Sequence, residues 1–456
     1  MQPNIIRTDD RELIKHALRG GRNTFVTGSA GSGKTFLAAE FREEEEDLER
    51  LEVALTASTG VAAINIGGET IHRFSGIGHC NRTAEIDQVV AMWDQRSRSP
   101  KPWHRNKYEA LMEADTIVID EVSMIRRDQL ELIDGVLRQT RGRLTSPFGG
   151  MQVVLVGDFF QLPPVVTGTE SRAFQDLKTK PFCFQSHLWS DADIQGFELT
   201  TQFRQSETDF LSALEEIRIG RVSESVHDLF MSRVGAKLDT QLRPVKLYPR
   251  RKEVAAENLA CVTALKGPFY RRRALFAGPK YEIEALKKEV TAHEVFQFKI
   301  GAQVMALVND MDGAYVNGSM GIITAVSDEG VFVEWADGSS CWVANNTWER
   351  TVWEKAGGRM EKRRTASMIQ LPLTLAYATT IHKSQGLTLD LVDLDPTGCF
   401  TAGQVYVALS RVRTLTGLRL KRWDPSVISA DKRVLQFYGV TRRPRPRLEV
   451  PDEHPF

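Results

Sequence analysis

Gly28-Ser29-Ala30-Gly31-Ser32-Gly33-Lys34-Thr35 decides the fold, because it fills every constrained position of the phosphate-binding pattern G-x-x-x-x-G-K-[ST]. Residues 24–27, before it, have the pattern of a short buried strand, and residues 36–41, after it, have helix-forming composition. In such a unit the glycines let successive backbone N–H groups point at phosphate oxygens. Lys34 is then expected to reach the β- and γ-phosphates, and Thr35 to ligate Mg²⁺. The stretch therefore predicts a site for a nucleoside triphosphate and magnesium.

The composition limits the class of protein. At 456 residues the chain is long for one domain, and 42% hydrophobic with 26% charged residues is ordinary for a globular protein. Lys+Arg and Asp+Glu both number 59, so the net charge gives no indication of a nucleic-acid partner. A zero net charge is still compatible with a local basic groove. Five widely spaced cysteines argue against a zinc or iron–sulfur site and suit a reducing cytosol. With no stretch near the roughly 18 apolar residues of a membrane span, we expect a cytoplasmic protein of several domains.

Two further strands end in residues suited to nucleotide hydrolysis. The apolar run 116–119 leads into Asp120 and Glu121, and the strand at 152–156 leads into a loop that carries Gln161. Asp120 is expected to hold Mg²⁺ through water, and Glu121 to orient and deprotonate the attacking water. Gln161 can hydrogen-bond both the γ-phosphate and that water. Paired acids can also be a helix cap, but behind a phosphate loop the catalytic interpretation is favoured.

Other segments have weaker signals. Residues 51–55 form an expected strand before the hydroxyl-rich stretch 56–63, and residues 67–72 form another polar turn. Each alone is typical of a solvated loop. In residues 76–107, cations alternate with Trp93 and Trp103, which fits either an exposed insertion that touches nucleic acid or a disordered, solvated loop. Residues 299–365 read as short strands separated by turns, which predicts a small barrel.

The order and wording of the motifs together are more specific than any one of them. The chain resembles the 5′-to-3′ branch of superfamily 1 helicases, and within it the Pif helicases, from Thr27 to Val412. The matching stretches are Gly28 to Thr35, Thr56 to Ala63 with Thr70-Ile71-His72, Ile119 to Met124, Gly157 to Val165, Phe203-Arg204, Gly301 to Met305, Thr380 to Gly386 and Tyr406 to Arg411.

The resemblance implies an α/β architecture of two RecA-like parallel-sheet lobes with two insertions. Lobe 1A is expected at 1–200, with a wedge-like 1B insertion at about 76–107. Lobe 2A is expected at 201–298 and 366–440, and an SH3-like β-barrel, 2B, at 299–365. A basic, proline-rich tail at 441–456 would follow.

The resemblance also implies roles for individual residues. ATP and Mg²⁺ would lie between the lobes, bound by residues 28–35 with Gln385 and Gly386. Catalysis would fall to Lys34, Glu121, Gln161 and two arginine fingers, Arg204 and Arg411, while Thr35 and Asp120 would serve the metal. Single-stranded DNA would cross both lobes on Thr56, Ser58, Thr59, Thr70, His72, Pro163, Thr380, His382, Lys383 and Ser384.

The implied activity is ATP-dependent 5′-to-3′ unwinding of DNA by a monomer. Its partners would be single-stranded DNA, duplex junctions and proteins of replication, recombination, repair or telomere maintenance. The expected source is bacterial or phage-type, with the enzyme acting at the nucleoid. Two alternatives stay open: a nucleic-acid-stimulated ATPase that switches conformation without unwinding, and a small-molecule kinase with the same phosphate loop.

The chain departs from the family pattern at two places. The family usually has a glutamine that reads adenine upstream of the phosphate loop, and Arg11 occupies that place here. The resemblance therefore does not extend to a strict preference for ATP. After Pro249 the family usually has a Thr-Asn pair, where this chain has Arg250-Arg251, so DNA contacts there are expected to differ.

Overall fold

The computed structural model describes residues 5–78, 85–166, 181–238, 242–310 and 312–440. The expected basic tail at 441–456, and residues 79–84 of the expected wedge, lie outside the described residues. No helix within the described ranges is both long and apolar enough to cross a bilayer.

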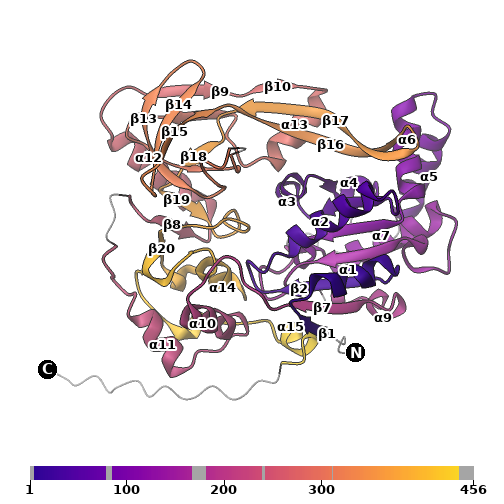
Figure 1. Ribbon diagram of the computed structural model, residues 1–456, viewed down its shortest axis with the longest axis horizontal. Coiled ribbons are helices and arrows are strands. Elements are labelled where there is room, and N and C mark those ends of the chain that lie inside the picture. Colours follow the sequence, from indigo (N-terminus) through magenta and orange to yellow (C-terminus); the bar gives the residue numbers. More distant parts are fainter. Residues whose placement is uncertain (1–4, 79–84, 167–180, 239–241, 311, 441–456) are drawn as a thin grey trace.

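The first lobe is built on a seven-stranded sheet in which every pairing is parallel (Figure 1). Its strands, in spatial order, are β1 (Ile5–Thr8), β7 (Gln195–Leu199), β2 (Thr24–Gly28), β6 (Gln152–Val156), β5 (Thr116–Asp120), β3 (Val53–Ala57) and β4 (Glu69–Thr70). The apolar runs predicted as strands are buried throughout, because helices cover both faces of a parallel sheet. Those helices include α1 (Arg11–Arg19), α2 (Lys34–Asp47) and α7 (Arg127–Thr140). The α/β prediction is confirmed.

The third strand of this lobe begins two positions later than residues 51–55 suggest. The backbone N–H of Glu52 donates to the carboxylate of Asp115, at 2.9 Å, and pairing with β5 starts only at Val53. Apolar content alone placed Leu51 in the strand. The N–H of Glu52 bonds to a side chain instead of the neighbouring strand, although its carbonyl still accepts the N–H of Thr116 at 3.2 Å.

The segment expected as a wedge forms helices in its described part. Helix α5 (Ile86–Ser97) and helix α6 (Pro102–Glu113) pack on each other, and α5 packs on α7. Trp93 is fully buried, and its indole N–H donates to the carbonyl of Ser75 at 2.9 Å, so it offers no ring to a base. Trp103 stays exposed. The burial of Trp93 explains why this segment is ordered rather than a solvated loop.

The second lobe has a smaller parallel sheet. Its strands, in spatial order, are β19 (Ala378–Thr380), β8 (Val245–Tyr248), β20 (Val392–Leu394) and β21 (Leu418–Leu420). Helix α10 (Thr208–Arg218) packs on helix α14 (Gln404–Leu409), and helix α12 (Arg251–Ala264) packs on β8 and β19.

The last described helix returns to the first lobe. In α15 (Lys432–Phe437), Phe437 lies 4.3 Å from Phe184 and 5.2 Å from Trp189 between ring centroids, inside the first lobe's core. Tyr438 stacks on Phe160 at 4.7 Å. The end of the stretch expected to be lobe 2A therefore packs with lobe 1, because its aromatic residues complete that core.

The expected small β-domain contains a five-stranded antiparallel sheet. Its strands, in spatial order, are β15 (Ser340–Ala344), β14 (Gly330–Trp335), β13 (Met320–Val326), β12 (Gln303–Ala306) and β18 (Leu373–Leu375). Buried Val304, Ile323 and Val333 belong to its own small core.

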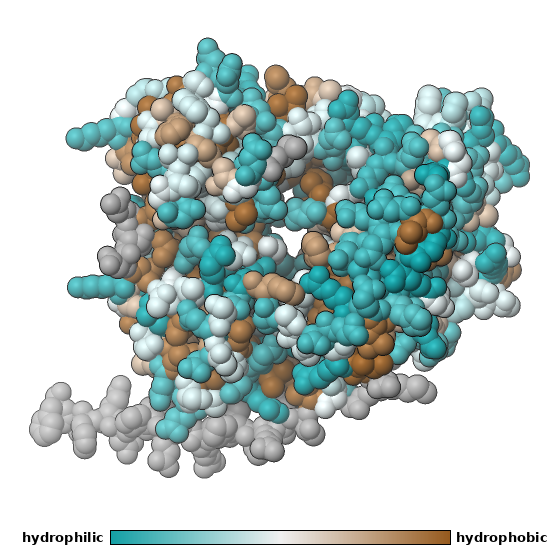
Figure 2. Space-filling model, viewed as in Figure 1, coloured by the Kyte–Doolittle hydropathy of each residue, from teal (hydrophilic) through white to brown (hydrophobic). Residues whose placement is uncertain are grey.

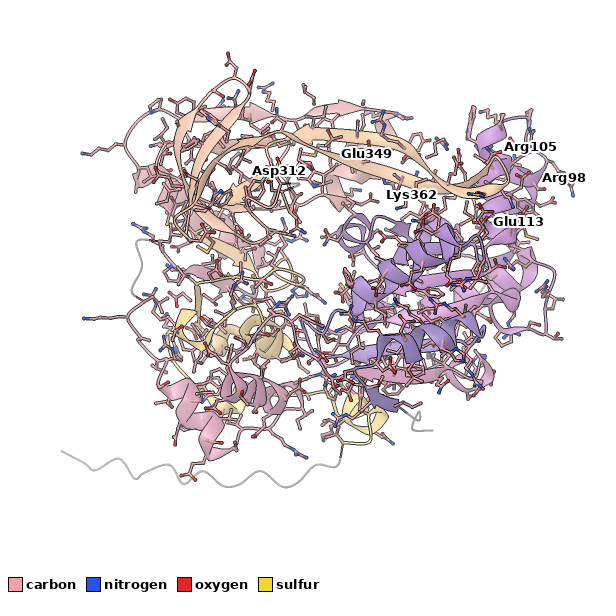
Figure 3. The ribbon with its side chains drawn as sticks, in the orientation of Figure 1. Arg98, Arg105, Glu113, Asp312, Glu349 and Lys362 are labelled. Carbon is pink, nitrogen blue, oxygen red and sulfur yellow. The ribbon has the colours of Figure 1, made fainter. Side chains whose placement is uncertain are left out.

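A long hairpin connects this insertion to the first lobe. Strands β16 (Asn346–Ala356) and β17 (Arg359–Gln370) leave the small sheet and cross above the gap between the lobes to reach α6 (Figure 1). Trp353 is 1% exposed, and its indole N–H donates to the carbonyl of Leu55 at 3.0 Å. Glu113 and Lys362 mark the end of the hairpin that lies on the first lobe (Figure 3). The hairpin therefore extends from the small antiparallel sheet of the insertion to the first lobe.

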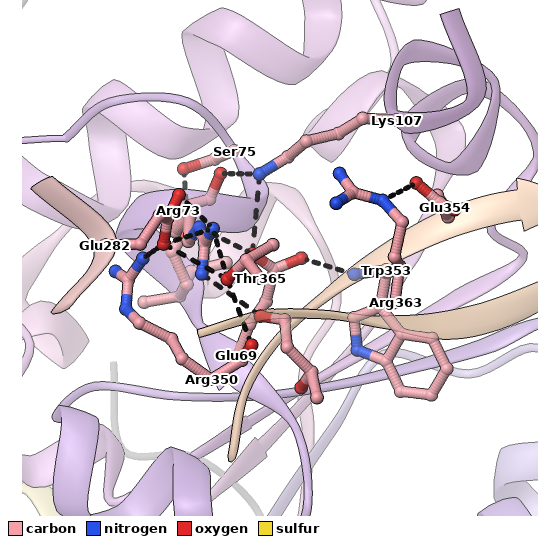
Figure 4. A network of polar contacts seen from close by, with 12 residues as sticks. Glu69, Arg73, Ser75, Lys107, Glu282, Arg350, Trp353, Glu354, Arg363 and Thr365 are labelled. Atoms are coloured by element: carbon pink, nitrogen blue, oxygen red, sulfur yellow. Dashed lines mark hydrogen bonds and ion pairs between the residues drawn. The ribbon is translucent and has the colours of Figure 1, made fainter. Parts of the chain in front are cut away.

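Charged side chains fasten the hairpin beside Trp353 (Figure 4). Glu69 of β4 accepts the backbone N–H of Trp353 at 2.9 Å and pairs with Lys107 of α6 at 3.4 Å. Arg73 reaches both carboxylate oxygens of Glu282, at 2.7 and 2.9 Å, and Glu282 also pairs with Arg350 of β16. Glu282 belongs to helix α13 (Lys280–Glu289), so this network joins three parts of the chain. Burial lowers the pKa of Lys107 to about 8.

Candidate nucleotide and nucleic-acid site

The phosphate loop connects β2 to α2 as predicted. Gly31 and Gly33 have φ angles of +92° and +81°, which favour glycine. A Cβ at Gly31 would lie 2.7 Å from the Cβ of Arg204, and a Cβ at Gly33 would lie 2.9 Å from Nη2 of Arg11. Both glycines are therefore needed for backbone conformation and for the close approach of neighbouring segments.

Lys34 lies inside the loop that precedes it. Its Nζ donates to the carbonyls of Gly28 and Ser29, at 2.8 and 2.9 Å. Burial lowers the pKa of Lys34, and the nearby carboxylates of Asp158 and Glu121 oppose that shift. The ammonium group thus lies within the phosphate loop, which is where the motif expects it to meet phosphates.

Thr35 and Asp120 meet at the end of β5. The hydroxyl of Thr35 donates to Oδ2 of Asp120 at 2.9 Å, while Oδ1 accepts the backbone N–H of Glu121 at 2.8 Å. Burial raises the pKa of Asp120, and these two hydrogen bonds oppose the shift. Within the described ranges, no group of three or more His, Cys, Asp or Glu could hold a metal by itself. One hydroxyl and one carboxylate fit Mg²⁺, which takes its other ligands from phosphates and water.

Glu121 connects the two lobes through Gln385. Nε2 of Gln385 donates to Oε2 of Glu121 at 3.0 Å and to Oε1 of Gln161 at 3.2 Å. Burial, helped by the charge of Asp120, raises the pKa of Glu121 to about 7. Glu121 also has φ +52°, an uncommon backbone conformation that occurs at functional sites. Three residues predicted from separate motifs therefore form one cluster.

The segment Phe203-Arg204, which lies outside the strands of the first sheet, packs against the phosphate loop. The backbone N–H of Phe203 donates to the carbonyl of Gly31 at 3.0 Å. The Arg204 guanidinium then donates to the hydroxyl of Thr388 at 3.0 Å and to the carbonyl of Ser410 at 3.3 Å, with a longer contact to the carbonyl of Gly386 at 3.5 Å. Burial lowers the pKa of Arg204 to about 10.

Arg411 lies beside Arg204 and is 1% exposed. It donates to the carbonyl of Val407 at 2.8 Å and to the hydroxyl of Ser410 at 2.7 Å. Burial lowers the pKa of Arg411, and the charge of Arg204 adds to the shift. Two guanidinium groups and the Lys34 ammonium thus gather near Glu121, an arrangement that a bound polyphosphate would neutralise.

Residues that sequence reasoning missed join the same site. The hydroxyl of Tyr406 accepts the backbone N–H of Ala30 at 2.9 Å, and the Gln202 side chain donates to the hydroxyl of Ser29. Tyr406 begins the stretch Tyr406 to Arg411, and Gln202 directly precedes Phe203-Arg204, so proximity to the motifs was a signal. Arg218 of α10 pairs with buried Asp158 at 3.0 Å, and no local pattern indicated that contact.

The expected DNA contacts fall into three groups by exposure. His382 and Lys383 are exposed, and Ser58, Thr59, Thr70, His72 and Pro163 are half-buried. Thr56, Thr380 and Ser384 are buried. The hydroxyl of Thr56 donates to the carbonyl of Val118 at 2.6 Å, and that of Ser384 to the carbonyl of Ile381 at 2.8 Å. In this structure these two hydroxyls bond to backbone carbonyls of the sheet and of the loop around His382.

Two parallel-sheet lobes, with a phosphate loop and carboxylates on the first and arginines beside Ser410 of the second, define a RecA-like nucleoside triphosphatase. A model of the PIF1-like helicase family matches residues 9–228. The chain is 35% identical, over 92% of its length, to the ATP-dependent DNA helicase Pif1 of Bdellovibrio bacteriovorus, covering 89% of that protein. It belongs to the PIF1-like helicase family.

The human relative, ATP-dependent DNA helicase PIF1, is 35% identical over 98% of this chain, which spans 66% of the human protein. The chain thus spans about two thirds of the length of the vertebrate relatives it matches. Among solved structures, the Bacteroides sp Pif1 complex with ADP-AlF4 superposes with a TM-score of 0.81 at 31% identity, covering 94% of this chain and 96% of that one. Bacteroides Pif1 bound to ssDNA gives 0.63 at 32% identity, with 95% and 96% covered.

Proposed function

We propose that this chain is an ATP-dependent 5′-to-3′ DNA helicase. The observation that carries the proposal is the arrangement of Arg204: its backbone crosses the phosphate loop while its guanidinium contacts Ser410 of the second lobe. A change at the γ-phosphate would therefore act on both lobes through Arg204. Relatives that carry the name ATP-dependent DNA helicase support the activity.

The proposed chemistry divides among the residues of the cluster. Lys34 and the loop N–H groups bind the phosphates, and Thr35 and Asp120 would hold Mg²⁺, which neutralises phosphate charge when bound. Glu121 orients the attacking water and accepts its proton, and Gln161 hydrogen-bonds the same water. Arg204 and Arg411 stabilise the charge that develops on the transferred γ-phosphoryl group and on the departing diphosphate.

The proposed DNA path runs across both lobes. An opening passes between the two halves of the molecule beneath the β16–β17 hairpin (Figure 2). His382 and Lys383 are exposed on the second lobe, and half-buried Thr59, Thr70 and His72 belong to the first. Cations and hydroxyls of this kind bind phosphates and sugars without reading sequence. Bacteroides Pif1, which this chain resembles, has been solved bound to ssDNA, and this supports single-stranded DNA as the ligand.

The proposal extends to the oligomeric state, the DNA substrates, the protein partners and the location of the chain. We infer action as a monomer at single-stranded DNA and duplex junctions, with proteins of replication, recombination or repair as partners. A cytoplasmic, nucleoid-associated location follows from those substrates.

The test is unwinding of duplexes that carry either a 5′ or a 3′ single-stranded tail, with MgATP. We expect the 5′-tailed duplex to be unwound and the 3′-tailed duplex to remain paired. Glu121→Gln, which retains the side-chain shape, serves as the hydrolysis-deficient control. Unwinding that persists in this variant, or a wild type that hydrolyses ATP with DNA yet separates neither duplex, would contradict the proposal; the second result would favour the conformational switch.

A further inference from the structure

Arg11 lies between two exposed aromatic rings at the edge of the phosphate loop. Its guanidinium carbon is 5.2 Å from the ring centroid of Phe36 and 5.1 Å from that of Phe203. The rings are 60% and 63% exposed. Because a Cβ at Gly33 would come within 2.9 Å of Nη2 of Arg11, this cluster lies directly against the loop.

The cluster faces away from the hydrolytic centre. Phe203 and Arg204 are consecutive, and Arg204 turns inward to Thr388 and Ser410 while Phe203 turns outward over Gly33. A nucleotide carries its base and its γ-phosphate at opposite ends. With the γ-phosphate beside Glu121, the base falls at Phe36 and Phe203, and exposed rings of this kind are platforms on which bases stack.

The guanidinium donors of Arg11 have no hydrogen-bond acceptor among the residues that the structure describes. The only ion pair of this side chain within those residues is with Glu40, at a loose 3.9 Å. A guanidinium donates through a planar fork and cannot accept. The O6 and N7 atoms of guanine both accept, whereas adenine offers an acceptor at N7 and a donor at N6. The fork therefore matches the edge of a 6-oxopurine and opposes one position of adenine.

We propose that Arg11 reads the O6/N7 edge of a 6-oxopurine, so that this site takes GTP and ITP at least as well as ATP. The proposal rests on the proposed function, since it requires that the loop bind a nucleoside triphosphate. It makes Arg11 a specificity-determining residue that is separate from the residues of hydrolysis.

The test compares ADP, GDP and IDP, each with Mg²⁺, by equilibrium binding, and the three triphosphates by hydrolysis with single-stranded DNA. In the wild type we expect GDP and IDP to bind alike and no more weakly than ADP. Arg11→Gln restores a side chain that both donates and accepts, and should shift the GDP-to-ADP affinity ratio toward ADP by about fivefold or more, the lower range for a bidentate base contact. Arg11→Lys keeps the charge but loses the fork, and should lose the 6-oxopurine preference as well.

Arg42→Gln is the matched control. The guanidinium carbon of Arg42 also lies over an aromatic ring, 4.9 Å from the ring centroid of Trp353, but Arg42 is in a later part of α2 than Phe36. It should leave the ratio unchanged, and Phe36→Ala should weaken all three diphosphates together. A wild type that binds ADP at least tenfold more tightly than GDP and IDP, or an Arg11→Gln ratio equal to that of wild type, would overturn the inference while leaving the helicase proposal standing. A chain that binds the diphosphates but hydrolyses none of the triphosphates with DNA would contradict the proposed function, and the binding ratios would still decide the role of Arg11.

Discussion

The environment of Glu121 raises the pKa of its carboxyl group to near neutral pH. Burial and the adjacent charge of Asp120 both favour its protonated form, while Lys34 and Arg411 oppose them, and the resulting pKa is about 7. A general base is most effective when its pKa lies near the working pH. The same burial that makes the carboxylate costly to ionise makes it a competent acceptor for the proton of water.

This pKa predicts the pH dependence of hydrolysis. The base must be deprotonated to act, so kcat/KM for the nucleotide should rise with pH through about 7 and level off above it. Because kcat/KM reports ionisations of the free enzyme, the comparison is made at low nucleotide with saturating single-stranded DNA. A rate that stays constant from pH 6 to pH 8 would contradict the assignment of Glu121 as the base.

Glu121→Gln tests the same residue without changing pH. The amide keeps an oxygen that can accept from Gln385, so nucleotide binding should stay within a few-fold of wild type. Cleavage should fall by about 10² to 10⁴, the usual contribution of general-base catalysis. Single-turnover cleavage and equilibrium binding, measured on the same preparation, separate the two effects. Equal losses in binding and cleavage would indicate a structural role instead.

At the scale of elements, local sequence predicted what local chemistry determines. The phosphate loop from Gly28 to Thr35 and the strand ending at Asp120 carry their own signals, and both lie where expected. The contact between Glu121 and Gln385 joins positions far apart in the chain, and only the resemblance brought those two residues to one site.

The β16–β17 hairpin and α15 went unrecognised for a different reason. The hairpin strands carry many charged residues and no long apolar run, yet Arg350 is fixed by Glu282 and Glu289 close to buried Trp353. Phe437 and Tyr438 form too short an apolar run to indicate which lobe they join. In both cases the deciding information is the complementary surface on lobe 1, which no local pattern encodes.

Trp353→Ala tests whether the hairpin is held mainly by this one side chain. Removing a fully buried tryptophan costs about 3 to 5 kcal/mol of stability, and here the loss falls on the attachment of the hairpin to lobe 1. We expect faster proteolysis at the exposed turn between β16 and β17 and a lower Tm. Trp342→Ala is the control, since Trp342 is 54% exposed on β15 and should change either quantity little. Equal effects of the two substitutions would contradict this account of the hairpin.

At the scale of the whole molecule, residues of both lobes form the proposed nucleotide site. The first lobe supplies Lys34, Asp120 and Glu121, and Arg204 and Arg411 converge on Ser410 of the second. Tyr406 adds a direct hydrogen bond from the second lobe to the backbone of the phosphate loop. Moving the lobes apart would break these contacts together. The state of the bound nucleotide can therefore change the position of one lobe relative to the other.

The most direct test of this account is single-turnover cleavage of the γ-phosphate by Arg204→Ala and Arg411→Ala, with saturating MgATP and single-stranded DNA. An arginine that completes a phosphoryl-transfer site contributes about 10³ to 10⁵ in rate. We predict that each variant loses cleavage by at least about 10³ while its affinity for the nucleotide changes less than about tenfold. Cleavage within tenfold of wild type in both variants would contradict the claim that the second lobe completes the site.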